Sequence, residues 1–311
     1  MKYQKTLAVL AGLTFAGALS HAQIAIGENL TISGFVDASY ANSDDGTTET
    51  SGINVDEVEI DFAFSFASVS AEVHLQTNAA DGVELEQAFV STDLGGITVS
   101  AGRMLNLLGF EADEPTGLLT HSNAYSDAYN PGSRYNDGFR GAFSQGDLSV
   151  AASITDDYSP GSAVGATTDA DDLAFDIALS YSGIENLSVS LGYADNSADS
   201  VALGGDLELV NVHASYSLGQ LTLAGEYNDW NDSGAESDAY LLLANYAVND
   251  DLSLTVRHSE VDHAVADDEE QTTIAVGYTV TDNLSTIIEY SSSEVGPVDS
   301  DLFAVEGIFT F

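Results

Sequence analysis

The stretch DLFAVEGIFTF, residues 301–311, alternates two kinds of side chain with a period of two. Phe303, Val305, Phe309 and Phe311 fall on one face, and Glu306 falls on the other. Successive side chains of a β-strand point to opposite sides, so this spacing predicts a strand with one apolar and one polar face. Such a strand has an apolar environment on one side and a polar environment on the other.

The same period recurs along most of the chain. Between residues 57 and 62, for example, carboxylates alternate with Val58, Ile60 and Phe62. No segment of comparable length shows a helical period. The pattern predicts about 16 strands, near residues 29–41, 53–66, 68–77, 83–92, 96–104, 137–144, 148–155, 172–182, 186–194, 205–218, 220–228, 238–247, 251–260, 271–280, 284–292 and 300–311.

The connectors between these strands alternate in length. Tight ones such as DLGG, SQGD and TDN are rich in turn formers, and longer acidic ones such as NSDDGTTETS, DDYSPGSAVGATTDADD and NDWNDSGAES lie between them. This asymmetry, an even strand count and aromatic residues near strand ends favour a membrane barrel over a soluble sandwich. In lipid the sheet must close. We therefore expect an all-β fold, a transmembrane antiparallel up-and-down β-barrel of about 16 strands, wide enough for an aqueous channel.

The beginning of the chain has the features of a secretory signal peptide. Lys2 and Lys5 precede an apolar run from Leu7 to Leu19, and small residues surround an expected cut after Ala22. The apolar run is too short to span a membrane as a helix. We expect residues 1–22 to be a cleaved signal peptide and residues 23–311 to form the outer-membrane barrel domain.

The chain is strongly acidic, with 50 Asp and Glu against six Lys and Arg. This balance excludes a nucleic-acid partner and favours cations as companions. There is no Cys, so a thiolate metal site is excluded. The acidic clusters NSDDG, DADD and DDEE lack the spacing of a calcium loop, so we expect no cofactor and no dedicated metal site, with loosely bound Ca²⁺ or Mg²⁺ at acidic loops as an open alternative.

The order of these parts resembles that of the Gram-negative general porins, and a barrel-porin-2-like family would look similar. The segment LEQAFVSTDLGGITVSAGR looks like the strand, turn and strand that precede the constriction loop in that family. The resemblance covers the chain after the signal peptide. It implies a homotrimer in outer-membrane lipid, inserted by the barrel-assembly machinery, for which Phe303, Val305, Phe309 and Phe311 would be the assembly signal.

The resemblance also implies a long third extracellular loop that folds into the pore. Its carboxylates would be Glu111, Asp113 and Glu114. The facing wall cations would be Arg103 and Arg140, with Arg134 near the return of the loop. A connector of about 33 residues in a compact barrel is itself a sign of a functional loop. A structural salt bridge that ties the loop to the wall remains the competing role for each arginine.

Strand parity predicts which charged residues point into the lumen. Arg140 alternates with Phe139 and Phe143 and points inward, as does Arg257, which we expect on the wall away from the long loop. Arg103 reaches the lumen only if Gly102 marks a bulge or the sheet ends there. The other residues expected to line the pore are Asp37, Glu57, Glu59, Asp61, Glu72, Asp176, Glu226, Glu289 and Glu306.

The function expected from these features is a water-filled, cation-preferring channel for passive diffusion of small hydrophilic solutes and ions. Two other classes remain open at this stage: a non-conducting outer-membrane barrel for adhesion or envelope anchoring, and a soluble acidic calcium-binding β protein. No nucleophile, base and orienting acid can be identified together, so we expect no catalytic residues and no enzyme activity. Heat-modifiable migration in detergent gels and single-channel conductance separate the three classes.

Overall fold

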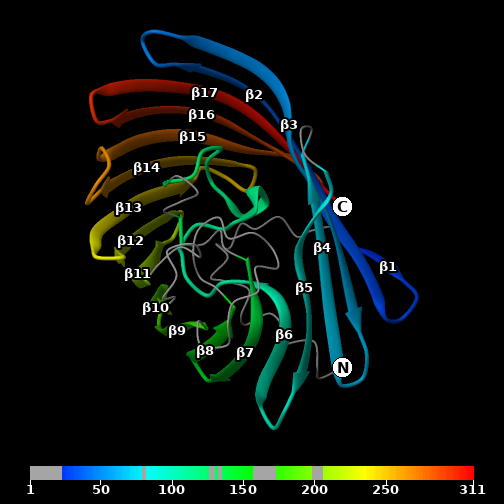
Figure 1. The fold of residues 1–311 in the computed structure, drawn as a ribbon. Coiled ribbons are helices and arrows are strands. Elements are labelled where there is room, and N and C mark those ends of the chain that lie inside the picture. The colour runs from blue at the N-terminus through cyan, green and yellow to red at the C-terminus, as the bar shows by residue number, and fades with distance from the viewer. Residues whose placement is uncertain (1–22, 79–81, 126–129, 132–134, 157–172, 198–205) are drawn as a thin grey trace.

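The polypeptide forms a ring of antiparallel strands in the computed structural model (Figure 1). The structure describes residues 23–78, 82–125, 130–131, 135–156, 173–197 and 206–311. The strands are β1 Ile24–Ile26, β2 Leu30–Asp44, β3 Glu49–Ser65, β4 Val69–Thr77, β5 Glu84–Asp93, β6 Ile97–Leu105, β7 Tyr135–Gln145, β8 Leu148–Thr155, β9 Ala174–Ile184, β10 Leu187–Ser197, β11 Asp206–Leu218, β12 Leu221–Asp232, β13 Ala235–Ala247, β14 Leu252–Asp262, β15 Glu269–Thr281, β16 Leu284–Val295 and β17 Val298–Thr310.

Each strand from β2 to β16 pairs antiparallel with the next strand along the chain, as in β2 with β3 and β16 with β17. The ring closes because β17 pairs with β2, where Phe309 lies opposite Val36. The sixteen strands β2 to β17 therefore form a closed up-and-down barrel, as the sequence predicts. The short β1 is an additional strand, which pairs with residues 30–32 of β2.

The two faces of the barrel wall differ as the period of two requires. Large apolar side chains such as Phe139, Ile154 and Ile274 are exposed on the outer face. On the inner face, polar and charged side chains such as Asp176 and Glu289 are buried. Soluble proteins have an apolar interior and a polar surface. The opposite arrangement seen here is expected for a barrel with lipid outside and a polar interior.

The sequence predicts three long acidic loops, and two of these three predictions are wrong. Within NSDDGTTETS, β2 continues to Asp44 and β3 begins at Glu49. Within NDWNDSGAES, β12 and β13 meet at a two-residue turn, Ser233 and Gly234, both with positive φ. Backbone pairing does not depend on side-chain polarity, so acidic segments continue the strands. The third predicted loop lies almost wholly in residues 157–172, outside the described residues.

Within the described residues, the helical element is a single short 3-10 turn, η2 Pro115–Gly117, which follows β6. None of the helices found in the described ranges has the length and apolar character needed to cross a membrane. The connection that contains η2 runs from residue 106 to residue 134 and is called the β6–β7 loop below. The predicted signal peptide, residues 1–22, lies outside the described residues.

Candidate functional site

The β6–β7 loop forms hydrogen bonds with inward-facing side chains of the barrel wall. A loop without a strand partner needs other acceptors for its backbone N–H groups, and here wall carboxylates supply them. The amide of Leu107 donates to Asp176 of β9 at 3.0 Å, and that of Phe110 donates to Glu226 of β12 at 2.8 Å. The amide of His121 donates to Glu289 of β16 at 2.6 Å.

These three wall carboxylates thus have a specific task. All three side chains are buried, and they belong to three different strands, of which β12 and β16 lie far from β6 around the ring and β9 lies nearer to it. Charge-assisted hydrogen bonds from backbone amides are among the stronger ones in proteins. The loop is therefore attached at three separated points along its length.

Arg257 of β14 is a fourth attachment, and its predicted position away from the long loop is wrong. Its side chain is fully buried. Nη1 lies 2.7 Å from Oε1 of Glu111 and donates to Oγ1 of Thr120 at 2.8 Å. Nη2 donates to Oγ of Ser122 and to the carbonyl oxygen of Asn123, both at 2.9 Å. The alternation of side chains along β14 predicts that Arg257 points inward. It does not predict which strands of the wall the loop contacts.

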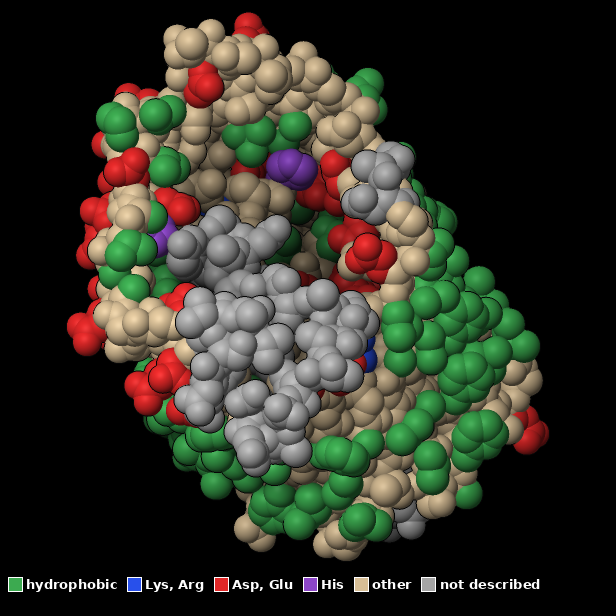
Figure 2. Space-filling model, in the orientation of Figure 1, with side chains coloured by type: hydrophobic (Ala, Val, Ile, Leu, Met, Phe, Trp, Pro, Cys, Tyr) green, Lys and Arg blue, Asp and Glu red, His purple; other side chains and the backbone are tan. Residues whose placement is uncertain are grey.

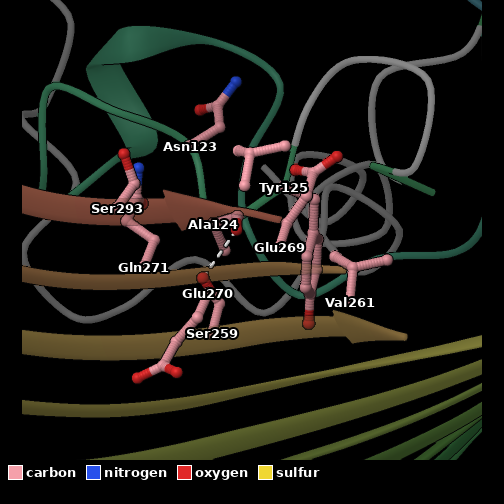
Figure 3. Close-up of a pocket in the computed structure, with 10 residues that line it drawn as sticks. Asn123, Ala124, Tyr125, Ser259, Val261, Glu269, Glu270, Gln271 and Ser293 are labelled. Carbon is pink, nitrogen blue, oxygen red and sulfur yellow. Dashed lines mark hydrogen bonds between the residues drawn. The ribbon is translucent and has the colours of Figure 1, made fainter. Parts of the chain in front are cut away.

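The loop segment after Glu111 also borders a pocket of about 230 Å³ (Figure 3). Asn123, Ala124 and Tyr125 form its loop side, and residues of β14, β15 and β16 form its wall side. Oγ of Ser259 donates to the carbonyl oxygen of Ala124 at 2.6 Å, which Figure 3 marks with a dashed line. The amide of Ala124 in turn donates to Glu111 at 2.7 Å.

The remaining predicted arginines do not contact Glu111 in the described structure. Arg103 pairs with Asp137 of the neighbouring strand β7 at 3.3 Å. The backbone of Gly102 has a φ of +133°, so β6 is distorted just before Arg103. Arg140 is half-buried, donates from Nε to Oγ of Ser153 at 2.9 Å and also bonds the carbonyl oxygen of Leu105. Arg134 lies outside the described residues.

The other two predicted loop carboxylates, Asp113 and Glu114, lie among further acids. One oxygen each of Glu86, Asp113 and Glu114 falls within 4.8 Å of the others, and the same holds for Glu57, Glu59 and Glu114. Burial, and then the charge of Glu59, raise the pKa of Glu114 well above its usual range. The predicted pairing of these loop acids with Arg103 and Arg140 is therefore replaced by contact with other acids.

Tyr135, at the start of β7, hydrogen-bonds this group of acids. Its hydroxyl bonds the carboxylates of Asp113 and Glu114. Acidic side chains also gather around the hollow in the face of the molecule drawn in Figure 2, whose outer wall carries hydrophobic side chains.

A histidine in the loop has a second acidic neighbourhood. Nδ1 of His121 lies 3.4 Å from Oε1 of Glu306, a buried residue of β17. The contact with Glu306 raises the pKa of His121 despite burial, and the charges of Glu289 and Asp56 act in the same direction. His121 is thus a titratable attachment of the loop.

The residues predicted to line the pore occupy the inner face. Asp37, Glu59 and Glu306 are buried, like the residues already described, and Glu57, Asp61 and Glu72 are half-buried. Their role in conduction stays a prediction. Sequence reasoning missed Glu86, because strand parity with Val90 puts it outside. The pairing of β4 with β5 shifts register beside it, between His74 and Leu75, and this bulge turns Glu86 inward.

A family model described as Gram-negative porin matches residues 6–296. The chain belongs to the Gram-negative porin family. Family membership and the closed barrel support an outer-membrane porin channel. No curated protein matches the sequence.

Solved structures of three other channels resemble this porin in fold. The anion-selective porin of Comamonas acidovorans has a TM-score of 0.68 at 15% identity, covering 91% of this chain and 99% of that one. OmpF of Salmonella typhi, solved with daunomycin, has a TM-score of 0.70 at 14% identity, covering 93% and 100%. The outer membrane channel DcaP of Acinetobacter baumannii has a TM-score of 0.70 at 12% identity, covering 91% and 97%.

Proposed function

We propose that this porin forms a water-filled, cation-preferring channel for passive diffusion of small hydrophilic solutes and ions across the outer membrane. The observation that carries the proposal is the charge of the described inner face. Its carboxylates far outnumber the arginines with described partners, which are Arg103, Arg140 and Arg257. A lumen lined by carboxylates attracts cations and repels anions.

The positive charge of Arg257 contributes little to the field in the lumen on this proposal. Its partner Glu111 lies 2.7 Å away, and the Arg257 side chain is fully buried. The pair is close to neutral as seen from the channel. Asp113 and Glu114 lie within 4.8 Å of Glu86, which adds a third acid at this edge of the loop.

The β6–β7 loop narrows the channel in this proposal. Its support is the set of hydrogen bonds that connect the loop to β9, β12, β14 and β16. β12, β14 and β16 lie across the ring from β6, so a loop that reaches them crosses the lumen. The constriction would then be bounded by Asp113 and Glu114 on the loop and by Glu57 and Glu59 on the wall.

The selectivity of a similar fold does not carry over. The porin of Comamonas acidovorans is anion-selective by its name, but at 15% identity its likeness to this chain concerns the backbone. Selectivity depends on which side chains line the lumen. The described lining of this porin is acidic, which favours the opposite preference.

The remaining features of the proposal follow the family. A trimer form is known for OmpT of Vibrio cholerae, whose structure has a TM-score of 0.64 with this one. We infer a homotrimer in outer-membrane lipid, reached after export through a cleaved signal peptide of residues 1–22 and insertion by the barrel-assembly machinery. The channel acts without catalysis.

The reversal potential of the purified protein in a planar bilayer tests the selectivity. Under a KCl gradient we expect discrete conductance steps and a potential with the sign of cation preference. Replacing Asp113 with Asn together with Glu114 with Gln should weaken that preference, because negative charge at the proposed constriction is lost. The control is Glu208→Gln, an exposed carboxylate of β11. Anion preference in the unaltered protein contradicts the proposed selectivity, and a complete lack of conductance contradicts the channel itself.

A further inference from the structure

The pocket between the β6–β7 loop and strands β14 to β16 is lined on its wall side by alternate residues. Glu269 and Gln271 of β15 have the same parity as the buried Thr273, so they point inward. Gln271 lies opposite Ser293 of β16, which also points inward. The pocket lies close to the ends of these strands, because β15 begins at Glu269 and β16 ends at Val295.

The size of the pocket limits what it can hold. Pockets that take drug-sized molecules have volumes of about 300–1,000 Å³, and this one has about 230 Å³. It therefore has room for a solute with a single ring. Val261 and Tyr125 are almost fully buried and supply the apolar part of the lining. An apolar lining with a few polar groups is typical of sites for small molecules.

The side-chain amide of Gln271 can offer hydrogen-bond donors to the pocket. Its Oε1 accepts hydrogen bonds from Nη2 of Arg257 and from the hydroxyl of Thr273. Because a guanidinium only donates, the atom that faces Arg257 must be the oxygen of the amide. The nitrogen lies on the other branch, and its N–H groups have no acceptor among the described residues. A solute that accepts hydrogen bonds would satisfy them.

The other polar groups of the pocket supply acceptors. Oε1 of Glu269 lies 3.1 Å from Nε2 of His263, and the Glu269 side chain is 29% exposed. A carboxylate has about four acceptor positions, so this contact leaves others for a solute. Oδ1 of Asn123 is buried and receives no hydrogen bond within the described residues. The hydroxyl of Ser293, 2.9 Å from that of Ser300, can donate or accept.

We propose that this pocket binds one uncharged polyhydroxylated ring of the size of a monosaccharide. Each hydroxyl group of such a solute both donates and accepts, which matches the donors of Gln271 and the acceptors of Glu269. The C–H groups of the ring would contact Val261 and Tyr125. A site that hydrogen-bonds hydroxyl groups rejects solutes without them, because its own polar groups would be left unpaired.

Charged solutes match the pocket less well. An anion would approach the carboxylate of Glu269 and would be repelled by the acidic inner face. A small ammonium ion would meet the N–H donors of Gln271 and, behind that amide, the buried guanidinium of Arg257. The second acid of the lining, Glu270, is exposed and has outward parity, and Figure 3 shows its side chain directed away from the other residues. The proposed solute site is therefore separate from the ion selectivity of the channel.

Saturation-transfer NMR with D-glucose tests the site in the purified protein, in a detergent that has no sugar head group. We expect a saturable signal in the unaltered protein. Ser293→Leu should abolish the signal, because the larger side chain fills the pocket. Glu269→Gln should weaken binding about two- to tenfold, the effect of one net hydrogen bond. The matched controls are Ser292→Leu and Glu270→Gln, at neighbouring positions that point outward, and both should keep the affinity unchanged.

Several distinct outcomes would contradict the proposal. A lack of any signal from glucose, or an equal signal in Ser293→Leu, would show that glucose does not bind in this pocket. Equal losses in Glu269→Gln and Glu270→Gln would indicate a general response to charge. An equally strong signal from glycerol would mean that the ring is not recognised, and saturation by choline in place of glucose would assign the pocket to small ammonium ions. Binding is measured without conduction, so a negative result leaves the channel proposal standing.

Discussion

Arg257 shows at the scale of one residue how the β6–β7 loop is held. Its guanidinium offers five N–H donors in a rigid plane, and loop carbonyl, hydroxyl and carboxylate oxygens surround it. The loop also packs apolar side chains such as Leu108 and Tyr125 into a cluster with inward residues of the wall such as Leu241. Arg257 adds to this apolar packing a buried cation that satisfies several loop oxygens at once.

Replacing Arg257 with Ala should release the loop from β14. Glu111, only 7% exposed, would lose its charged partner, and breaking a buried ion pair costs about 3–5 kcal/mol. We expect faster proteolysis of the loop and noisier single-channel current. Arg140→Ala is the matched control, because Arg140 is half-buried and bonds a serine and a carbonyl. Equal effects of the two changes would contradict the special position of Arg257.

His121 should make the attachment of the loop dependent on pH. Its contact with Glu306 raises its pKa, so the folded loop binds the proton more tightly than the unfolded chain. The stabilising contribution is complete below about pH 6.5, the ordinary value, and is lost as pH rises through the raised pKa. We expect slower loop proteolysis in mildly acidic than in alkaline buffer, and a smaller difference in His121→Gln. The same pH dependence in both proteins would rule out His121 as its source.

At the scale of the element, β6 is bent where it approaches β5. A Cβ on Gly102 would collide with the carbonyl oxygen of Ala88, and the φ of +133° is itself unfavourable for other residues. Gly102→Ala should therefore destabilise the barrel by about 1–3 kcal/mol. Unfolding in urea, followed by heat-modifiable migration, measures this. Gly52→Ala in β3 is the control, because its nearest neighbour, the Asn54 side chain, is 3.9 Å away. A Gly102→Ala barrel as stable as the control would contradict the close approach.

The elements also show what a period of two can and cannot predict. Strand identity follows from alternation, and Asp176, Glu226 and Arg257, which alternation predicts to point inward, are buried and contact the β6–β7 loop. Alternation fails where register shifts, as at Glu86, and it cannot reveal contacts between distant elements. The partners of the loop therefore had to come from the structure. Polar composition led to a wrong prediction at residues 42–51, because residues 42–44 and 49–51 pair as β2 and β3 although their side chains are polar.

For the whole molecule, the excess of carboxylates makes selectivity a long-range property. At 0.01 M salt the Debye length is about 30 Å, so the electric fields of many wall carboxylates overlap in the lumen. At 1 M salt it is about 3 Å, and each carboxylate is screened within that distance. Cation preference should therefore be strongest in dilute salt and fall as salt rises. Reversal potentials at constant gradient ratio and different mean concentrations measure this. A preference that is independent of concentration would assign selectivity to one short-range site instead.

The pairing of β17 with β2 has a consequence for the time that folding takes. Phe309 meets Val36 only after every strand between them has been ordered or bypassed, so this contact carries the largest loop-closure entropy in the ring. High contact order slows folding, and two unpaired edges invite association in the meantime. The chain has no Cys, and Ala41 lies opposite Ala304. A disulfide introduced between these two positions would join the edges in advance and shorten the slowest refolding phase.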